Sequence, residues 1–120
     1  MIYLTLEDLL ALFQDLGDLP VRDLGLLEAA AARPATTLYG EDAYPAVHEK
    51  AAVLLESITR NHALIDGNKR LGWLSMYVFL VINGHELDAP ADAAYDLVIA
   101  VSTGATGHKS AAAIIAGWIR

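Results

Sequence analysis

Apolar residues recur every three or four positions along most of the chain, which is the spacing of an amphipathic helix. One segment, residues 71–82, is apolar at almost every position and predicts a buried helix that ends near Asn83. The remaining helices should each show one apolar and one polar face. They are predicted at residues 6–16, 24–33, 46–60, 90–102 and 111–119.

Candidate capping residues stand where several of these helices should begin. Thr5, with Asp8 three positions later, predicts a capping box before the first helix. Asp23 and Ser110 are expected to cap the second and the last helix. Pro45 suits the first turn of the third helix.

Glycine and proline mark the ends of several helices. Residues 17–20 (Gly-Asp-Leu-Pro) should stop the first helix, Pro34 the second, and Gly84 should cap the apolar helix. Residues 35–44 favour extended structure with a turn at Gly40. We expect a loop or small hairpin there, either a simple connector or a flap that docks a substrate segment.

Composition agrees with a helical fold. The chain of 120 residues is 55% hydrophobic, is rich in alanine and leucine, and has few β-branched runs. We therefore predict a single all-α domain over residues 1–120, with about six helices around a central buried helix formed by residues 71–82. There is no cysteine, so disulfides and thiolate zinc sites are excluded.

The charge distribution separates one short stretch from the rest. A net charge of −7 argues against non-specific binding of nucleic acid or of an acidic membrane. Yet Arg60, Lys69 and Arg70, three of the eight basic residues, lie within eleven positions, as expected of an anion site. The chain does not begin like a signal peptide. Its apolar segment is shorter than the roughly 20 residues of a membrane span, so we expect a cytoplasmic protein.

Chemically active side chains gather at residues 61–70, Asn-His-Ala-Leu-Ile-Asp-Gly-Asn-Lys-Arg, directly before the apolar helix. His62 supplies an imidazole, a group that can take a proton from a hydroxyl. Asp66 offers the oxygen ligand that magnesium prefers beside phosphates. The start of a buried helix also provides free N–H groups for an anion.

The next residues suit a phosphate. Gly67 permits an unusual backbone angle and a close approach, Asn68 offers an amide donor, Lys69 a point charge, and Arg70 a planar fork of donors. Each residue alone is common on protein surfaces or at helix caps. Their order within one loop predicts phosphate chemistry, whereas a transition-metal site is disfavoured because no third ligand is near.

Residues 62–70 resemble the motif of the Fic superfamily, specifically its death-on-curing (Doc) toxin branch. That motif is broadly His-Pro-Phe-x-Asp/Glu-Gly-Asn-Gly/Lys-Arg, and its spacing matches throughout, with Ala63 and Leu64 in place of Pro-Phe. The similarity extends to residues 6–12, 25–33 and 39–44 and to the Asn-Gly-His after the apolar helix.

Two departures from the AMP-transferring members point to the Doc branch: Lys69 replaces a glycine, and Trp73 replaces a second arginine. The resemblance then implies a Fic-like fold, a reversed nucleotide, and a Ser/Thr kinase that transfers the γ-phosphate of ATP. His62 would activate the target hydroxyl and Asp66 would hold magnesium. Phosphates would be bound by Gly67, Asn68, Lys69 and Arg70.

The resemblance also implies partners. Members of this branch phosphorylate a threonine of elongation factor Tu and so arrest translation. A Phd-type antitoxin neutralises them through a C-terminal segment that folds on binding. Two alternatives stay open, namely AMP transfer to a protein hydroxyl on the same scaffold and a non-catalytic Fic-fold binding module. Direct contact with nucleic acid or a membrane is not expected.

Overall fold

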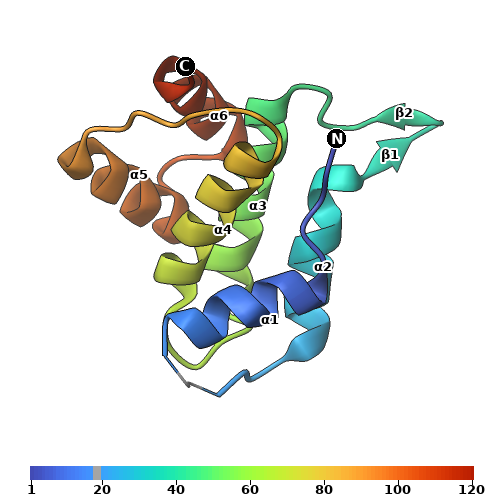
Figure 1. Ribbon diagram of the computed structural model, residues 1–120, viewed down its shortest axis with the longest axis vertical. Coiled ribbons are helices and arrows are strands. Elements are labelled where there is room, and N and C mark those ends of the chain that lie inside the picture. Colours follow the sequence, from blue (N-terminus) through green and yellow to red (C-terminus); the bar gives the residue numbers. More distant parts are fainter. Residues whose placement is uncertain (18–19) are drawn as a thin grey trace.

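The computed structural model describes residues 1–17 and 20–120, and Figure 1 shows a bundle of helices with one small hairpin. This confirms the predicted all-α fold class. The helices are α1 (Leu6–Asp15), α2 (Leu24–Ala32), the 3₁₀ turn η1 (Arg33–Ala35), α3 (Val47–Asn61), α4 (Asn68–Ile82), α5 (Ala91–Thr103) and α6 (His108–Trp118). The strands are β1 (Thr37–Leu38) and β2 (Glu41–Asp42).

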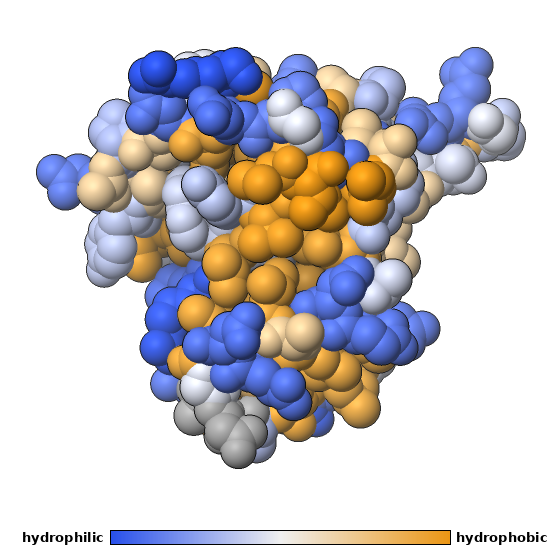
Figure 2. All heavy atoms as spheres, viewed as in Figure 1, coloured by the Kyte–Doolittle hydropathy of each residue, from blue (hydrophilic) through white to orange (hydrophobic). Residues whose placement is uncertain are grey.

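The centre of the fold is α3. Residues 50 to 59 are all buried, and α2, η1, α4, α5 and α6 pack against this helix. The prediction that residues 71–82 form the central helix is wrong, because α4 exposes Tyr77 and Val81. Figure 2 shows apolar side chains over the middle of the face where α4 lies. Among the described residues, no helix combines the length and apolarity needed to cross a bilayer.

An apolar and a polar face were predicted for the helix at residues 46–60, but two charged residues of α3 are buried. The Lys50 ammonium, in a side chain that is 1% exposed, donates to the Pro34 carbonyl oxygen at 3.2 Å and to the Asp42 carboxylate at 3.1 Å. Glu56 accepts from the Arg33 guanidinium at 2.8 Å. Because each buried charge has a partner, α3 can be enclosed on all sides although its sequence is amphipathic.

The structure confirms the caps at the starts of α1 and α2. The Thr5 hydroxyl accepts from the Asp8 N–H at 3.2 Å, and the Asp8 carboxylate accepts from the Thr5 N–H at 2.8 Å. This reciprocal pair is a capping box. The Asp23 carboxylate accepts from the Leu26 N–H at 3.1 Å.

Other predicted helix ends need correction. Ser110 does not cap α6, because Gly107 is the N-cap and Ser110 lies within the first turn. Pro45 precedes the N-cap of α3 and is not in its first turn. The expected stop of the first helix at residues 17–20 includes residues 18 and 19, which lie outside the described residues. Gly84 follows α4 with φ +84°, as predicted.

Residues 37–42 form the hairpin that the sequence allowed. Strands β1 and β2 are antiparallel, with Leu38 opposite Glu41. The two turn residues between them, Tyr39 and Gly40, have φ of 52° and 82°. Positive φ at both positions is the signature of a type I′ turn, whose twist matches that of a hairpin.

The hairpin and the loop that follows α3 lie at opposite ends of this helix, as Figure 1 shows. Lys50, in the first turn of α3, holds Asp42 of the hairpin. His62 follows the last residue of α3, and a helix of this length spans about 22 Å. The hairpin therefore does not line the pocket around His62, and a flap docking a substrate there is not supported.

Candidate functional site

The chain leaves α3 at His62 through a left-handed turn. His62 is the C-cap residue, with φ 52° and ψ 41°, a conformation that few residues other than glycine adopt. Arg22 contributes to holding this turn, since its guanidinium donates to the His62 carbonyl oxygen. The backbone N–H groups of Arg22 and Asp23 both donate to the Ala63 carbonyl oxygen, at 2.8 and 2.9 Å. The imidazole itself is exposed.

Two residues of this loop are buried in the core, and the candidate functional residues lie before and after them. Ala63 and Leu64 are 1% and 2% exposed. The Asn68 side chain closes the loop, because its carbonyl oxygen accepts from the Leu64 N–H at 3.1 Å and its amide donates to the Leu64 carbonyl oxygen at 3.0 Å. Asn68 therefore fixes the loop through its side chain, whereas the sequence predicted an amide donor to a phosphate.

Helix α4 begins at this loop with its first N–H groups uncapped. The N-cap is Gly67, with φ 91°, and no side chain accepts a hydrogen bond from the first turn. The N–H groups of a first helical turn have no intrahelical acceptor, and the helix dipole places partial positive charge there. Lys69 and Arg70 add two exposed cations at the same end. This helix start is suited to an anion.

All six predicted site residues line one cavity of 290 Å³. They are His62, Asp66, Gly67, Asn68, Lys69 and Arg70. Thr59, Ile65 and Ser102 complete the lining. Ser102 comes from α5, and no sequence signal links it to the loop. The cavity thus joins a potential base to an anion-binding helix start, with α5 as its far wall.

Asp66 lies near one of these cations at the start of α4. Its carboxylate accepts from the Gly67 N–H at 2.8 Å and lies 3.9 Å from the Arg70 guanidinium. Both side chains are more than half exposed, so this ion pair adds little stability. Within the described residues no three His, Asp or Glu side chains gather. Asp66 alone would hold a magnesium ion, which commonly keeps several waters and takes phosphate oxygens as further ligands.

Arg60 is not part of the anion site, contrary to the sequence-based expectation. Its guanidinium donates to the carbonyl oxygens of Val101 at 2.8 Å and Thr106 at 2.9 Å, and lies 3.4 Å from the Glu56 carboxylate. It thereby ties the end of α5 to the end of α3, two residues before His62. The local cations of the pocket are Lys69 and Arg70.

The Glu56 carboxylate is shared by three basic side chains, those of Arg33, Arg60 and His108. Burial raises the pKa of its carboxyl, but the hydrogen bond from Arg33 and the charges of Arg33, Arg60 and His108 outweigh burial and leave this pKa below its ordinary value. The His108 imidazole lies 3.6 Å from the carboxylate. Glu56 therefore connects η1, α3 and α6 and indirectly supports the α5 wall of the cavity.

Helices α3 and α4 approach closely just behind the cavity, at Gly72. A Cβ atom at Gly72 would lie 2.8 Å from the Thr59 methyl group and 3.3 Å from a Leu55 methyl group. We expect Gly72→Ala to lower the free energy of unfolding by about 1–3 kcal/mol, the usual cost of overpacking. It should also displace the start of α4 relative to His62.

The matched control for this change is Gly117→Ala, because a Cβ atom at this helical position would meet no atom within 4 Å. It should be neutral or stabilise the fold, since alanine favours helix more than glycine does. Thermal unfolding of both variants tests the packing. Equal melting temperatures for the two variants would contradict a tight α3–α4 contact at Gly72.

Comparisons with known proteins show the family of this chain. The model of the Fic/DOC family matches residues 3–80, a span that contains the whole loop and most of α4. A protein named Toxin Doc from Mycolicibacterium smegmatis (strain ATCC 700084 / mc(2)155) is 53% identical over 104 residues. The aligned region covers 85% of this chain and 80% of that protein. The chain belongs to the Fic/DOC family.

Proposed function

We propose that the protein is a Doc-like toxin of a toxin–antitoxin system and acts as a protein kinase. It transfers the γ-phosphate of ATP to a hydroxyl of a translation protein, a threonine of elongation factor Tu, and so arrests translation. The observation that carries this proposal is the shared cavity, which His62 lines together with the uncapped start of α4, Lys69 and Arg70. The similarity to a protein named Toxin Doc supports the toxin role.

The side chains fit an in-line transfer. His62 takes the proton of the target hydroxyl while its oxygen forms a bond to the γ-phosphorus. The bond from this phosphorus to the β–γ bridging oxygen breaks, and ADP leaves with the electron pair. The N–H groups of α4, with Lys69 and Arg70, stabilise the charge on the phosphoryl oxygens. Magnesium, held by Asp66 when bound, would neutralise part of the phosphate charge.

Lys69 is the residue that favours phosphate transfer over AMP transfer. It lines the cavity where AMP-transferring relatives of the wider superfamily would carry glycine, so its side chain occupies space and adds charge beside one phosphate. AMP transfer on the same scaffold is the second candidate. The intact set of His62, Asp66, Asn68 and Arg70 in one cavity speaks against a purely non-catalytic module.

Intact-mass analysis of elongation factor Tu after incubation with the protein, ATP and magnesium tests the reaction type. We expect the mass to rise by one phosphoryl group, and Lys69→Ala to slow this transfer about tenfold or more, as loss of a charge-assisted phosphate contact should. Lys109→Ala, on the first turn of α6, is the matched control and should react like the unmodified chain. A rise by one adenylyl group would establish AMP transfer instead.

An antitoxin partner follows from the same proposal, and we propose that it is a Phd-like protein whose C-terminal segment folds on binding. Its presence should restore growth of a bacterium that expresses this chain. Co-expression with a Phd-type antitoxin tests this, and growth arrest that persists despite a stable complex would contradict neutralisation by that partner.

A further inference from the structure

A second, larger hollow adjoins the candidate site. It has a volume of 620 Å³ and runs along the exposed face of α4 toward α5. Its lining is almost entirely apolar, and we call it the apolar groove. The groove is lined chiefly by Leu16, Trp73, Leu74, Tyr95, Val98 and Ile99.

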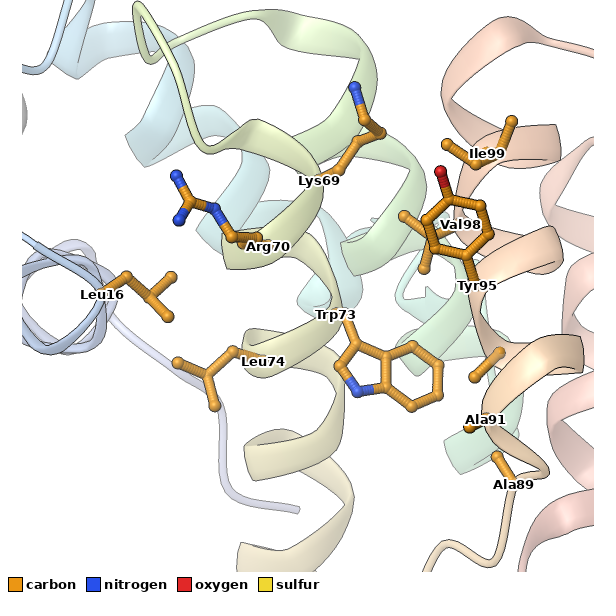
Figure 3. A pocket seen from close by; sticks show the side chains of 11 residues that line it. Leu16, Lys69, Arg70, Trp73, Leu74, Ala89, Ala91, Tyr95, Val98 and Ile99 are labelled. Carbon is orange, nitrogen blue, oxygen red and sulfur yellow. The ribbon is translucent and has the colours of Figure 1, made fainter.

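The apolar groove and the anion cavity lie next to each other and share two lining side chains. Lys69 and Arg70 line both spaces. In Figure 3, Lys69 projects from the first turn of α4 at one end of the groove, and Trp73 extends from the next turn toward α5. The groove is therefore the apolar space next to the start of α4, where the phosphates of a ligand would lie.

The two spaces differ in size and in chemistry. The anion cavity, at 290 Å³, is small against the roughly 300–1,000 Å³ of pockets that enclose a whole ligand. It suits a phosphate chain, so the nucleoside of a nucleotide must lie outside it. The groove offers that space and presents two aromatic rings, Trp73 and Tyr95, on either side.

The Trp73 ring is held in position by its neighbour. It packs edge-on against Trp118, with ring centroids 6.4 Å apart and an interplanar angle of 68°. Tyr95 is 68% exposed and leaves its ring available. Flat aromatic faces of this kind bind nucleic-acid bases by stacking, and Lys69 places a cation where the phosphates meet the nucleoside.

We propose that the apolar groove binds the purine nucleoside of the phosphate donor, with the base against Trp73 and Tyr95. This inference rests on the proposed function and adds a subsite to it. In this proposal the Trp73 ring supplies the stacking surface for the base, which the loop before α4 does not offer.

The test compares ATP with inorganic tripolyphosphate, each with magnesium, for binding to the full chain and to Trp73→Leu. ATP should bind at least tenfold more tightly than tripolyphosphate. Trp73→Leu, which keeps an apolar side chain, should lower ATP affinity about tenfold and leave tripolyphosphate affinity unchanged.

Each other outcome overturns a defined part of the account. If the unmodified chain binds ATP and tripolyphosphate with equal affinity, the nucleoside subsite alone is overturned. The same holds if Trp73→Leu does not change the affinity for ATP. A protein segment would then be the alternative ligand of the groove. If Trp73→Leu lowers the affinity for ATP and for tripolyphosphate alike, the nucleoside subsite is also overturned. If neither ligand binds the unmodified chain, the proposed function fails, and the subsite fails with it.

Fluorescence gives an independent readout. Trp73 and Trp118 are the two tryptophans of the chain, so in Trp118→Phe the emission reports Trp73 alone. ATP should shift or quench this emission, and tripolyphosphate should change it much less. Identical responses to the two ligands would contradict stacking on Trp73.

Discussion

Replacing His62 by alanine or asparagine should lower phosphate transfer by about 10²–10⁴-fold, the usual contribution of a general base. The imidazole is exposed and has no hydrogen-bond partner among the described residues, so its loss should leave the fold intact. Asparagine tolerates the left-handed backbone conformation at this position better than alanine does. His62→Asn therefore separates the loss of the base from backbone strain.

Transfer rates and bacterial growth on expression measure this effect. His85→Ala changes a histidine outside the cavity and should keep full activity. Equal growth arrest by the unmodified chain and by a folded His62→Asn variant would remove His62 from the mechanism.

Glu56→Gln should produce the largest loss of stability, about 2–3 kcal/mol at neutral pH, because it removes the carboxylate shared by Arg33, Arg60 and His108. The value is below that of a fully buried pair because the two arginines are partly exposed. For a chain of this size the melting temperature should fall by about 10 °C.

The pH dependence of that loss has a defined sign. Because the folded-state pKa of Glu56 lies below its ordinary value of 4.5, the carboxylate stabilises the fold above that pH. This contribution disappears as the pH falls through the folded-state pKa. The stability difference between the unmodified chain and Glu56→Gln should therefore narrow in acid, measured by denaturant unfolding across pH. A difference that widens in acid would contradict the pairing, and Glu86→Gln, on an exposed residue, is the control.

The sequence was sufficient to predict the helices and the residues that line one cavity together, because both depend on residues close together in the chain. Spacing located the helices, and the loop from His62 to Arg70 brings its functional residues together by local geometry. The capping box of Thr5 and Asp8 is local in the same way.

Features that depend on distant partners could not be predicted. Lys50 and Glu56 looked like surface residues, and only contacts with Asp42 and Arg33 explain their burial in α3. For the same reason, apolarity alone pointed to residues 71–82 as the central helix.

The anion site shows the same limit. Arg60 lies close to the loop in sequence, yet its guanidinium is taken up by carbonyl oxygens beyond residue 100. Ser102 reaches the cavity from α5 through that connection. The side chain of Asn68 turns inward to the Leu64 backbone, a contact that residue type alone does not reveal.

We propose that one cavity holds both the base and the site of the transferred phosphoryl group. Label transfer to elongation factor Tu tests this most directly, with ATP labelled on its γ-phosphate in one reaction and on its α-phosphate in another. The γ-label should appear on the target with the unmodified chain and not with a folded His62→Asn variant, and the α-label should appear with neither. Transfer of the α-label, or undiminished transfer of the γ-label by His62→Asn, would contradict the account.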